Sequence, residues 1–220
     1  IMSKALKKLS DQYLGLLTTE LSGINLTRIN NSDEFYEKQI IDSVIPFSLS
    51  SKFENLVFKS DATLVDVGFG GGFPLVPIAF SSPNSNCIGL ESKNKKVKAV
   101  ELISEKLGVK NIKLFHQRIE SVMIDIPALI TFKAVGEIKD LLSKINACHK
   151  EVYVYFYKGP KLNEKEDLSL LPENWKQIED ISYELPTFGA RRLIGYKIKN
   201  VPRGTTNKSL VKLSELAVSY

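Results

Sequence analysis

The fold of this chain is decided by one stretch of sequence, Asp66-Val67-Gly68-Phe69-Gly70-Gly71-Gly72-Phe73-Pro74. An apolar run from Ala62 to Val67 precedes it and predicts one buried strand. A short apolar run to Phe80 follows it and predicts a helix, with Pro74 in its first turn. Four glycines in five positions indicate a tight turn that a ligand approaches closely, because glycine adopts positive φ without steric cost. This order predicts a nucleotide-type cofactor site at the carboxyl end of a parallel strand.

Strand-like and helix-like patterns alternate on both sides of the glycine turn. Seven strands are expected, at residues 62–67, 87–91, 111–115, 128–132, 152–157, 178–184 and 193–199. Helices are expected at 92–107, where Gly108 would end the helix, and from Ile138 to Ile145. The sequence therefore predicts an α/β fold with a doubly wound, mostly parallel seven-stranded sheet and an antiparallel C-terminal hairpin.

The residues before the first strand predict a helical cap. One helix is expected at 4–17, and a second from the capping cluster Asn30-Asn31-Ser32-Asp33 to about Val44. Residues 48–61 are mixed and polar, and they join the helical cap to the core. We therefore divide the chain into an N-terminal helical cap (1–60), a cofactor-binding domain (61–200) and a basic, polar C-terminal tail (201–220).

Composition narrows the class of protein further. The 220 residues carry 30 Lys and Arg against 25 Asp and Glu, and the net charge of +5 weakly favours a polyanionic partner. No apolar run is long enough to span a bilayer, and the N-terminal residues lack the apolar segment of a signal peptide. Two cysteines in apolar contexts indicate a reduced, cytoplasmic protein, and His116 and His149 lack metal-ligand spacing, so no metal is expected.

Three elements predict the cofactor class. Phe73 occupies the third glycine position of the dinucleotide fingerprint, which argues against NAD or FAD. Glu91 ends the second predicted strand, where a carboxylate binds ribose hydroxyls. The triplet Arg118-Ile119-Glu120 follows the third strand, where a loop can frame an adenine.

These residues resemble the glycine motif of class I S-adenosylmethionine-dependent methyltransferases. More specifically, the chain is similar to the bacterial small-subunit ribosomal RNA guanosine-N7 methyltransferase family, RsmG/GidB, over about residues 10–210. Further motifs lie in the family's order: Asn25-Leu26-Thr27, Ile41-Asp42-Ser43, Gln117-Arg118-Ile119-Glu120, Lys158-Gly159, Pro202-Arg203-Gly204 and Asn207-Lys208.

The resemblance implies the cofactor, its ligands and the substrate. S-adenosylmethionine would be bound by Gly68, Gly70, Gly72, Phe73, Glu91, Ile119, Glu120 and Lys133. Lys133 stands where the family usually has an arginine near the reactive end of the cofactor, which implies a catalytic position, and Gln39 replaces a common histidine. The implied substrate is N7 of a guanosine in the 530 loop of 16S ribosomal RNA. The implied partner is the small ribosomal subunit, and a monomeric enzyme is expected.

The chemistry explains why no catalytic triad is needed. A sulfonium methyl is already activated, and guanine N7 carries an available lone pair, so alignment and water exclusion are the main tasks. N7 lies on the major-groove edge, which is deep and narrow in A-form RNA, so the target base should lie in a loop or be splayed out. Predicted RNA-binding residues are Arg191, Arg192, Arg203 and Lys208, and predicted base-stacking residues are Phe69, Phe73, Phe188, Arg191 and Arg192.

Three other interpretations stay open. The same fold can methylate a protein or a small molecule. A catalytically decayed, RNA-binding relative is compatible with Lys133 and Gln39 at their positions. A dinucleotide-dependent oxidoreductase is disfavoured by Phe73 but would be detected by titration with NADH.

Overall fold

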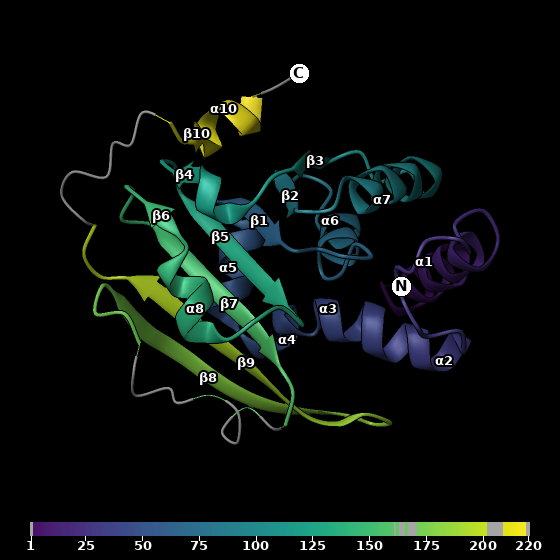
Figure 1. Ribbon diagram of the computed structural model, residues 1–220. Helices are drawn as coiled ribbons and strands as arrows, with labels where there is room; N and C mark the ends of the chain where they lie inside the picture. Colours follow the sequence, from purple (N-terminus) through teal and green to yellow (C-terminus); the bar gives the residue numbers. More distant parts are fainter. Residues whose placement is uncertain (1, 161, 163–165, 167–170, 202–208, 219–220) are drawn as a thin grey trace.

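A seven-stranded sheet forms the centre of the computed structural model (Figure 1), which describes residues 2–160, 162, 166, 171–201 and 209–218. The strand order is β3-β2-β1-β5-β7-β9-β8, and all neighbours up to β7 are parallel, whereas β9 is antiparallel to both β7 and β8. The strands are β1 (Thr63–Val67), β2 (Cys87–Glu91), β3 (Ile112–His116), β5 (Ala128–Lys133), β7 (Val152–Lys158), β8 (Trp175–Leu185) and β9 (Gly189–Ile198). The predicted fold class is confirmed.

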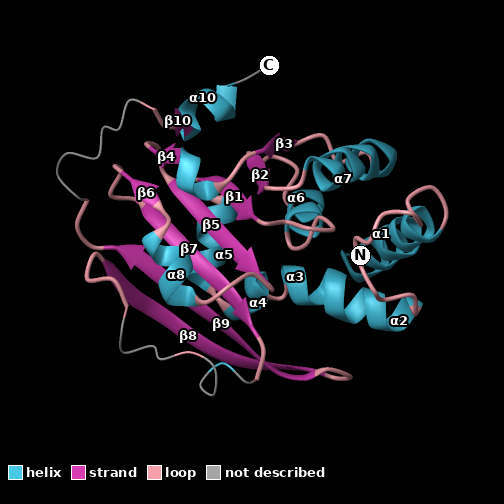
Figure 2. Ribbon diagram, in the orientation of Figure 1, coloured by secondary structure: helices cyan, strands magenta, loops and turns pink. Residues whose placement is uncertain are grey.

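Helices cover both faces of the sheet (Figure 2), as a doubly wound fold requires. One face packs in a single core cluster with α5, α6 (Leu75–Ser81), α7 (Asn94–Leu107) and the N-terminal helices. The other face packs against α8 (Ile138–Ser143) and the C-terminal helix α10 (Leu213–Val218). Because both faces are covered, every residue of β1 and β2 is buried, which explains why most of their residues are apolar.

Helix α6 begins two residues later than expected. Pro74 precedes its first residue, Leu75, and does not lie within the first turn. The end of α7 agrees with the prediction, since Gly108 has φ of 69° in the left-handed region and closes the helix.

The N-terminal region folds into helices as predicted, with one difference. Helix α1 spans Met2–Thr18, and a second, continuous helix is built from α2 (Ser32–Phe35), a π-helical segment η1 (Tyr36–Ile41) and α3 (Asp42–Val44). The Asn31 side chain accepts hydrogen bonds from the backbone N–H groups of Asp33 and Glu34, so it is the N-cap. The π-helical turn was not predicted, because nothing in the local sequence pattern distinguishes it from an α-helix.

The segment that joins the helical cap to the core is itself helical. The structure has α4 (Pro46–Leu49) and α5 (Ser51–Phe58) there. The Ser50 side chain caps α5 by accepting from the Phe53 backbone N–H, and Phe53 is fully buried beneath the sheet. Burial of the apolar side of α5 stabilises this helix although the segment as a whole is mixed and polar.

A second, small sheet of order β10-β4-β6 was also not expected. Its strands are β4 (Val122–Ile124), β6 (Asn146–Ala147) and β10 (Val211–Lys212), too short to show a periodic pattern. The Ser214 backbone N–H and hydroxyl both donate to the Asp125 carboxylate, at 3.0 and 2.6 Å, and so fasten α10 beside β4. The C-terminal segment is therefore attached to the main core.

The long β8–β9 hairpin reaches the N-terminal helices. At its tip the Thr187 backbone N–H donates to Glu37 of the π-helical segment at 2.6 Å. The Lys38 ammonium lies 4.8 Å from the centre of the Phe188 ring. These contacts bring the hairpin and the π-helical segment to the same edge of the sheet as the glycine turn.

Within the part of the chain that is described, no helix has the length and apolar character that crossing a bilayer requires. The same residues contain no group of three or more His, Cys, Asp or Glu side chains placed to hold a metal ion.

Candidate functional site

The glycine turn lies at the carboxyl end of β1, which is an inner strand of the sheet between β2 and β5. Gly68 and Gly70 have φ of 70° and 57°, a conformation that side chains with a Cβ rarely adopt. A Cβ at Gly70 would meet nothing closer than 3.7 Å, so this part of the turn faces open space. That is the geometry expected where a ligand contacts the backbone.

The other half of the turn faces the core. The Tyr13 hydroxyl donates to the Gly71 carbonyl, and a Cβ at Gly72 would overlap that hydroxyl. Phe73 packs against Tyr13 with ring centroids 4.9 Å apart and against Phe35 at 5.6 Å. Helix α1 thus supports the turn from beneath, which gives Gly72 a structural reason to be glycine.

The predicted base-stacking role of two phenylalanines is wrong. Phe69 and the side chain of Phe73 are only 2% and 7% exposed and belong to the core. They pack under the turn because its tight path carries them inward. The Phe73 backbone remains a predicted cofactor contact.

Glu91 fastens the turn to the end of β2. One carboxylate oxygen accepts from the Gly70 backbone N–H at 3.1 Å. The other accepts from the Lys93 backbone N–H at 3.0 Å and the Ser92 hydroxyl at 3.3 Å. Glu91 therefore both caps the start of α7 and holds a carboxylate beside the open half of the turn.

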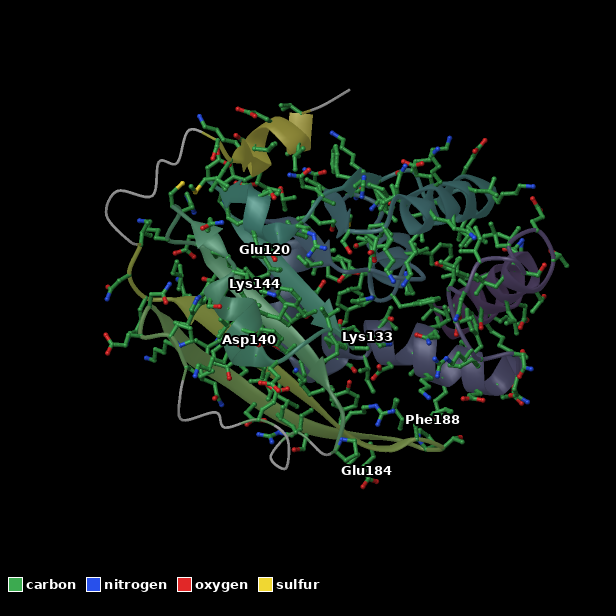
Figure 3. All side chains as sticks on the ribbon, in the orientation of Figure 1. Glu120, Lys133, Asp140, Lys144, Glu184 and Phe188 are labelled. Atoms are coloured by element: carbon green, nitrogen blue, oxygen red, sulfur yellow. The ribbon has the colours of Figure 1, made fainter. Side chains whose placement is uncertain are left out.

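A cavity of about 140 Å³ joins three of the predicted cofactor residues. Gly68, Ile119 and Glu120 line it, together with Gln117 and Arg118 from the segment after β3. The Glu120 carboxylate lies 3.9 Å from the Lys144 ammonium, and Figure 3 labels both beside this edge of the sheet. The cavity is partly apolar, as a purine site should be.

A second cavity of about 290 Å³ lies further along the same edge, past β5 and β7. Ala134 lines it, while the next residue, Val135, lines the first cavity, so a single loop separates the two. The lining residues come from η1, α3, β5, β7 and β9: Lys38, Gln39, Asp42, Lys133, Ala134, Tyr157, Lys158, Gly159 and Arg191. The two cavities and the glycine turn form one continuous row.

Lys133 is held in this second cavity by the N-terminal helices (Figure 3). Its ammonium lies 2.9 Å from a carboxylate oxygen of Asp42 and donates to the Lys38 carbonyl at 2.8 Å. Burial lowers the pKa of Lys133, and the Asp42 carboxylate opposes that shift. Asp42 in turn accepts a 2.7 Å hydrogen bond from Tyr183 of β8.

The two predicted arginines of β9 lie on opposite faces of the sheet, because side chains alternate along a strand. Arg191 lines the second cavity, and its guanidinium donates to the carbonyls of Phe188 and Ala190. Arg192 pairs with Asp180 of β8 on the other face, which raises the pKa of its guanidinium. Arg203 and Lys208 lie outside the described residues.

Sequence reasoning missed three side chains of the site. Asp42 and Tyr183 position Lys133, and only tertiary structure joins them, although Asp42 belongs to a motif that the resemblance had flagged. Asp66, fully buried under the turn, accepts from the Thr131 hydroxyl at 2.9 Å. Burial raises the pKa of Asp66 to about 7, opposed by that hydrogen bond and by the charge of Lys133. Its place two residues before Gly68, in the motif that the sequence analysis quotes, was the available signal.

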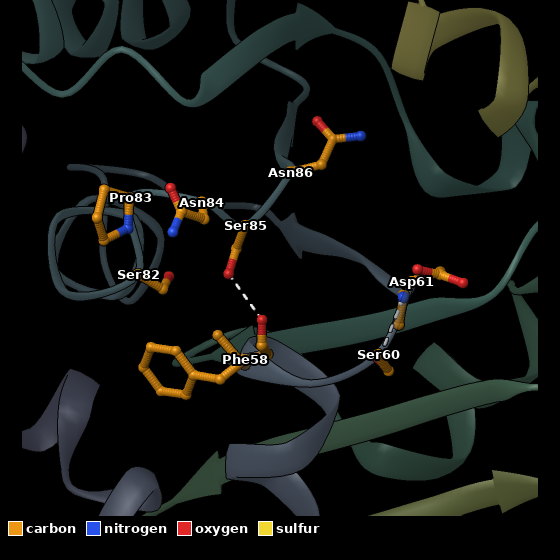
Figure 4. A pocket seen from close by; sticks show the side chains of 10 residues that line it. Phe58, Ser60, Asp61, Ser82, Pro83, Asn84, Ser85 and Asn86 are labelled. Atoms are coloured by element: carbon orange, nitrogen blue, oxygen red, sulfur yellow. Dashed lines mark hydrogen bonds between the residues drawn. The ribbon is translucent and has the colours of Figure 1, made fainter.

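One cavity carries none of the predicted residues. It measures about 330 Å³ and lies at the opposite edge of the sheet, before β1 and β2 (Figure 4). Ser60, Ser82 and Asn84 are among its lining residues, and the Ser85 hydroxyl is already bonded to the Val57 carbonyl at 2.7 Å. Ligand sites in open α/β sheets lie at the carboxyl ends of the strands, so the row described above is the better candidate.

The residues present fit a nucleoside cofactor with an amino-acid tail. The left-handed backbone at Gly68 and Gly70 lets a ligand approach the turn closely, Glu91 offers a carboxylate to hydroxyls, and the first cavity is partly apolar, as a purine site should be. A cofactor of this class has no pyrophosphate, so the turn does not need to bind one.

A family model described as GidB, rRNA small subunit methyltransferase G, matches residues 6–194. Relatives named ribosomal RNA small subunit methyltransferase G include one from Clostridium novyi, 30% identical over 87% of this chain and 81% of the relative, and one from Lactococcus lactis subsp. cremoris, 29% identical over 92% and 90%. With a Clostridium botulinum relative the identity is 39%, but this alignment covers 49% of the chain and only 43% of the relative.

Solved structures support the fold alone, since their sequence identities are low. Magnesium protoporphyrin IX methyltransferase from Synechocystis superposes with a TM-score of 0.55 at 14% identity, over 84% of this chain and 93% of that one. A methyltransferase-like protein from Escherichia coli gives 0.52 at 11% identity, over 72% and 87%.

Proposed function

This chain belongs to the rRNA small subunit methyltransferase G family, and we propose on that basis that it is an S-adenosylmethionine-dependent enzyme that methylates N7 of a guanosine in 16S ribosomal RNA. The observation that carries the proposal is the row of two cavities at the carboxyl ends of the strands, of which the first is lined by Gly68 of the glycine turn. One cavity suits the cofactor's nucleoside, and the other is large enough for an unstacked base and is lined by cations.

The proposed cofactor contacts lie on three neighbouring strands. The backbone at Gly68, Gly70 and Phe73 would bind the amino-acid tail, with Gly72 keeping the turn in shape. Glu91 would accept hydrogen bonds from the ribose hydroxyls. Ile119 and Glu120 would flank the adenine. All of these residues lie in 61–200, which supports the proposed cofactor-binding domain.

When bound, S-adenosylmethionine supplies a methyl group that is already activated by its sulfonium charge. The chain's own residues then need to orient the acceptor and exclude water, since guanine N7 carries its own lone pair. Asp42 and Lys133 close the second cavity from the side of the N-terminal helices, where their ion pair is largely buried. Lys133 is the proposed catalytic residue because it lines the second cavity directly before the loop that separates the two cavities.

The proposed RNA contacts are cationic. Arg191 lines the second cavity, called the base cavity because we propose that the target base binds there, and Arg192, Arg203 and Lys208 are proposed to bind backbone phosphates of the RNA. The base must leave its stack to reach the cavity, which costs a few kcal/mol that such contacts would offset. The partner is the small ribosomal subunit, and this substrate would put the enzyme in the cytoplasm. A monomer is proposed because one chain lines both cavities.

Transfer of a labelled methyl group tests this proposal. Labelled S-adenosylmethionine is incubated with the protein and with stripped 16S ribosomal RNA, immature small subunits, or an RNA-free protein extract. Label in either RNA sample but not in the extract is expected. Label in the extract alone would indicate a methyltransferase of another substrate, and RNA binding without any transfer would indicate a decayed relative.

A further inference from the structure

The side chains that line the second cavity are mainly hydrogen-bond donors, and only the Gln39 amide, the Tyr157 hydroxyl and the Asp42 carboxylate can also accept. Its cationic residues are Lys38, Lys133, Lys158 and Arg191, and its one carboxylate is that of Asp42. Both oxygens of Asp42 are already engaged, one by the Tyr183 hydroxyl and the other by Lys133. The hydroxyl of Tyr157 also donates away from the cavity, to the Ser43 carbonyl at 2.9 Å. The cavity therefore suits a ligand edge that only accepts hydrogen bonds.

Lys133 supplies one donor of this cavity, at the end of β5 and directly before the loop that separates the two cavities. An ammonium has three N–H groups. Two of them are used, by Asp42 at 2.9 Å and by the Lys38 carbonyl at 2.8 Å. The third has no protein partner among the described residues, and the Lys133 side chain lines the cavity. One charged donor is thus left for the ligand, in a direction fixed by the other two bonds.

The edge of guanine that carries N7 fits this arrangement, whereas that of adenine does not. Guanine presents N7 and O6, both acceptors, side by side. Adenine presents N7 beside the N6 amino group, a donor, which would face the ammonium of Lys133 without a partner. Both bases have a nucleophilic N7, so N7 itself cannot be the basis of the choice.

We propose that the free N–H of Lys133 donates to O6 of the target base and thereby makes the enzyme specific for guanine, with Asp42 and Tyr183 as positioning residues. This inference rests on the proposed function, since it assumes that the base enters the second cavity with N7 towards the cofactor. A donor that is desolvated and oriented in advance rejects the base that cannot accept from it.

The charge state of Lys133 agrees with this role. Burial lowers the pKa of its ammonium, and the Asp42 carboxylate, which faces it directly, is the strongest opposing influence. Asp66 from β1 also favours the charged form, and Arg191 from β9 disfavours it. Asp42 therefore both aims the ammonium and keeps it protonated.

The test compares two substrates that differ at the 6-position. One RNA carries guanosine at the methylated position, and the other carries 2-aminopurine riboside, which keeps N7 but lacks O6. We expect the wild-type enzyme to lose about 10- to 100-fold in kcat/KM on the second RNA. In Lys133→Met the two RNAs should react at nearly equal, low rates, while Lys133→Arg should restore the preference.

A matched control is Lys197→Met. Lys197 also forms a 2.9 Å ion pair, with Glu151, but at the opposite edge of the sheet. Its variant should keep the wild-type preference for guanosine. If Lys133→Met leaves Asp42 unpaired and does not fold, the variant Asp42→Asn with Lys133→Met removes both charges and serves in its place. Thermal unfolding followed by circular dichroism verifies that each variant is folded.

The outcomes separate the two claims. A wild-type enzyme that methylates no guanosine in ribosomal RNA contradicts the proposed function itself. If the wild-type enzyme methylates guanosine and Lys133→Met keeps the same preference for guanosine over 2-aminopurine riboside, only the role of Lys133 is contradicted. For the positioning role of Asp42, the alkaline fall of kcat/KM should move to lower pH in Asp42→Asn, because the pKa of Lys133 falls. An unmoved pH profile would mean that Asp42 does not act through Lys133.

Discussion

Glu91 has two roles that one substitution can separate. Its carboxylate caps α7 through Lys93 and supports the turn through the Gly70 N–H, and it is the proposed ribose ligand. Because a glutamine side chain keeps one acceptor oxygen, the turn can survive its introduction while the charge-assisted bonds to ribose are weakened.

For Glu91→Gln we predict 10- to 100-fold weaker binding of S-adenosylhomocysteine, since a hydrogen bond to a charged group contributes about 1.5–3 kcal/mol. Isothermal calorimetry measures this. The control is Glu105→Gln, an exposed position on α7, which should bind as the wild type does. Equal affinities in both variants would show that Glu91 is a helix cap only.

Asp66 should make the stability of the protein depend on pH. Its pKa of about 7 in the folded state lies above the ordinary 3.8, because it is buried. The folded chain then holds a proton that the unfolded chain releases, so this contribution is full at low pH and is lost as pH rises from about 4 to about 7. Relative to the wild type, Asp66→Asn should gain on the order of a few kcal/mol across this interval. Urea unfolding at several pH values tests this, and a constant difference would contradict it.

At the scale of elements, the glycine turn is a strand-to-helix connection with two different sides. The side at Gly70 faces open space, and the side at Gly72 presses against Tyr13 of α1. Substitutions at these two positions should therefore fail in different ways.

We predict that Gly70→Val abolishes cofactor binding but costs only about 1–2 kcal/mol of stability, the strain of a left-handed residue. Gly72→Ala should cost more, because its Cβ would overlap the Tyr13 hydroxyl in a filled core. Thermal unfolding and calorimetry together measure both. Wild-type affinity in Gly70→Val would show that the turn does not face the cofactor.

Helices and strands could be predicted from the sequence where an apolar run or a capping motif extended over several residues. The seven strands, the end of α7 at Gly108 and the cap at Asn31 followed from apolar runs and capping residues. Helix α5 was missed because its polar average hid the buried Phe53, and β4 and β6 have too few residues to show alternation. Of the site, Gly68, Glu91 and Ile119 came from local motifs, whereas the Asp42–Tyr183 contact depends on chain segments that meet only in the folded protein.

At the scale of the whole molecule, the chain is basic, and some of its cations line the second cavity. The net charge is +5, and Arg191 and Lys158 line the base cavity at the edge where the strands end. When a base of the RNA enters this cavity, the neighbouring phosphates lie near these cations. Binding of the RNA should therefore weaken as the salt concentration rises.

We predict that Arg191→Ala lowers the slope of log affinity against log salt by about 1, the effect of one lost phosphate contact. Filter binding of 16S ribosomal RNA between low and moderate salt gives this slope. Lys59→Ala removes the same charge from an exposed position before β1, at the opposite edge, and should leave the slope unchanged. Equal slopes in both variants would mean that the RNA does not approach the base cavity.

The central claim is that this site transfers a methyl group to N7 of a guanosine in small-subunit ribosomal RNA. Mapping N7-methylguanosine by reduction and strand cleavage, after incubation of unmethylated 16S RNA with the protein and S-adenosylmethionine, tests it most directly. The predicted result is cleavage at one guanosine, absent with Gly70→Val. Methyl incorporation at another atom, or none at all with the cofactor demonstrably bound, would contradict the claim.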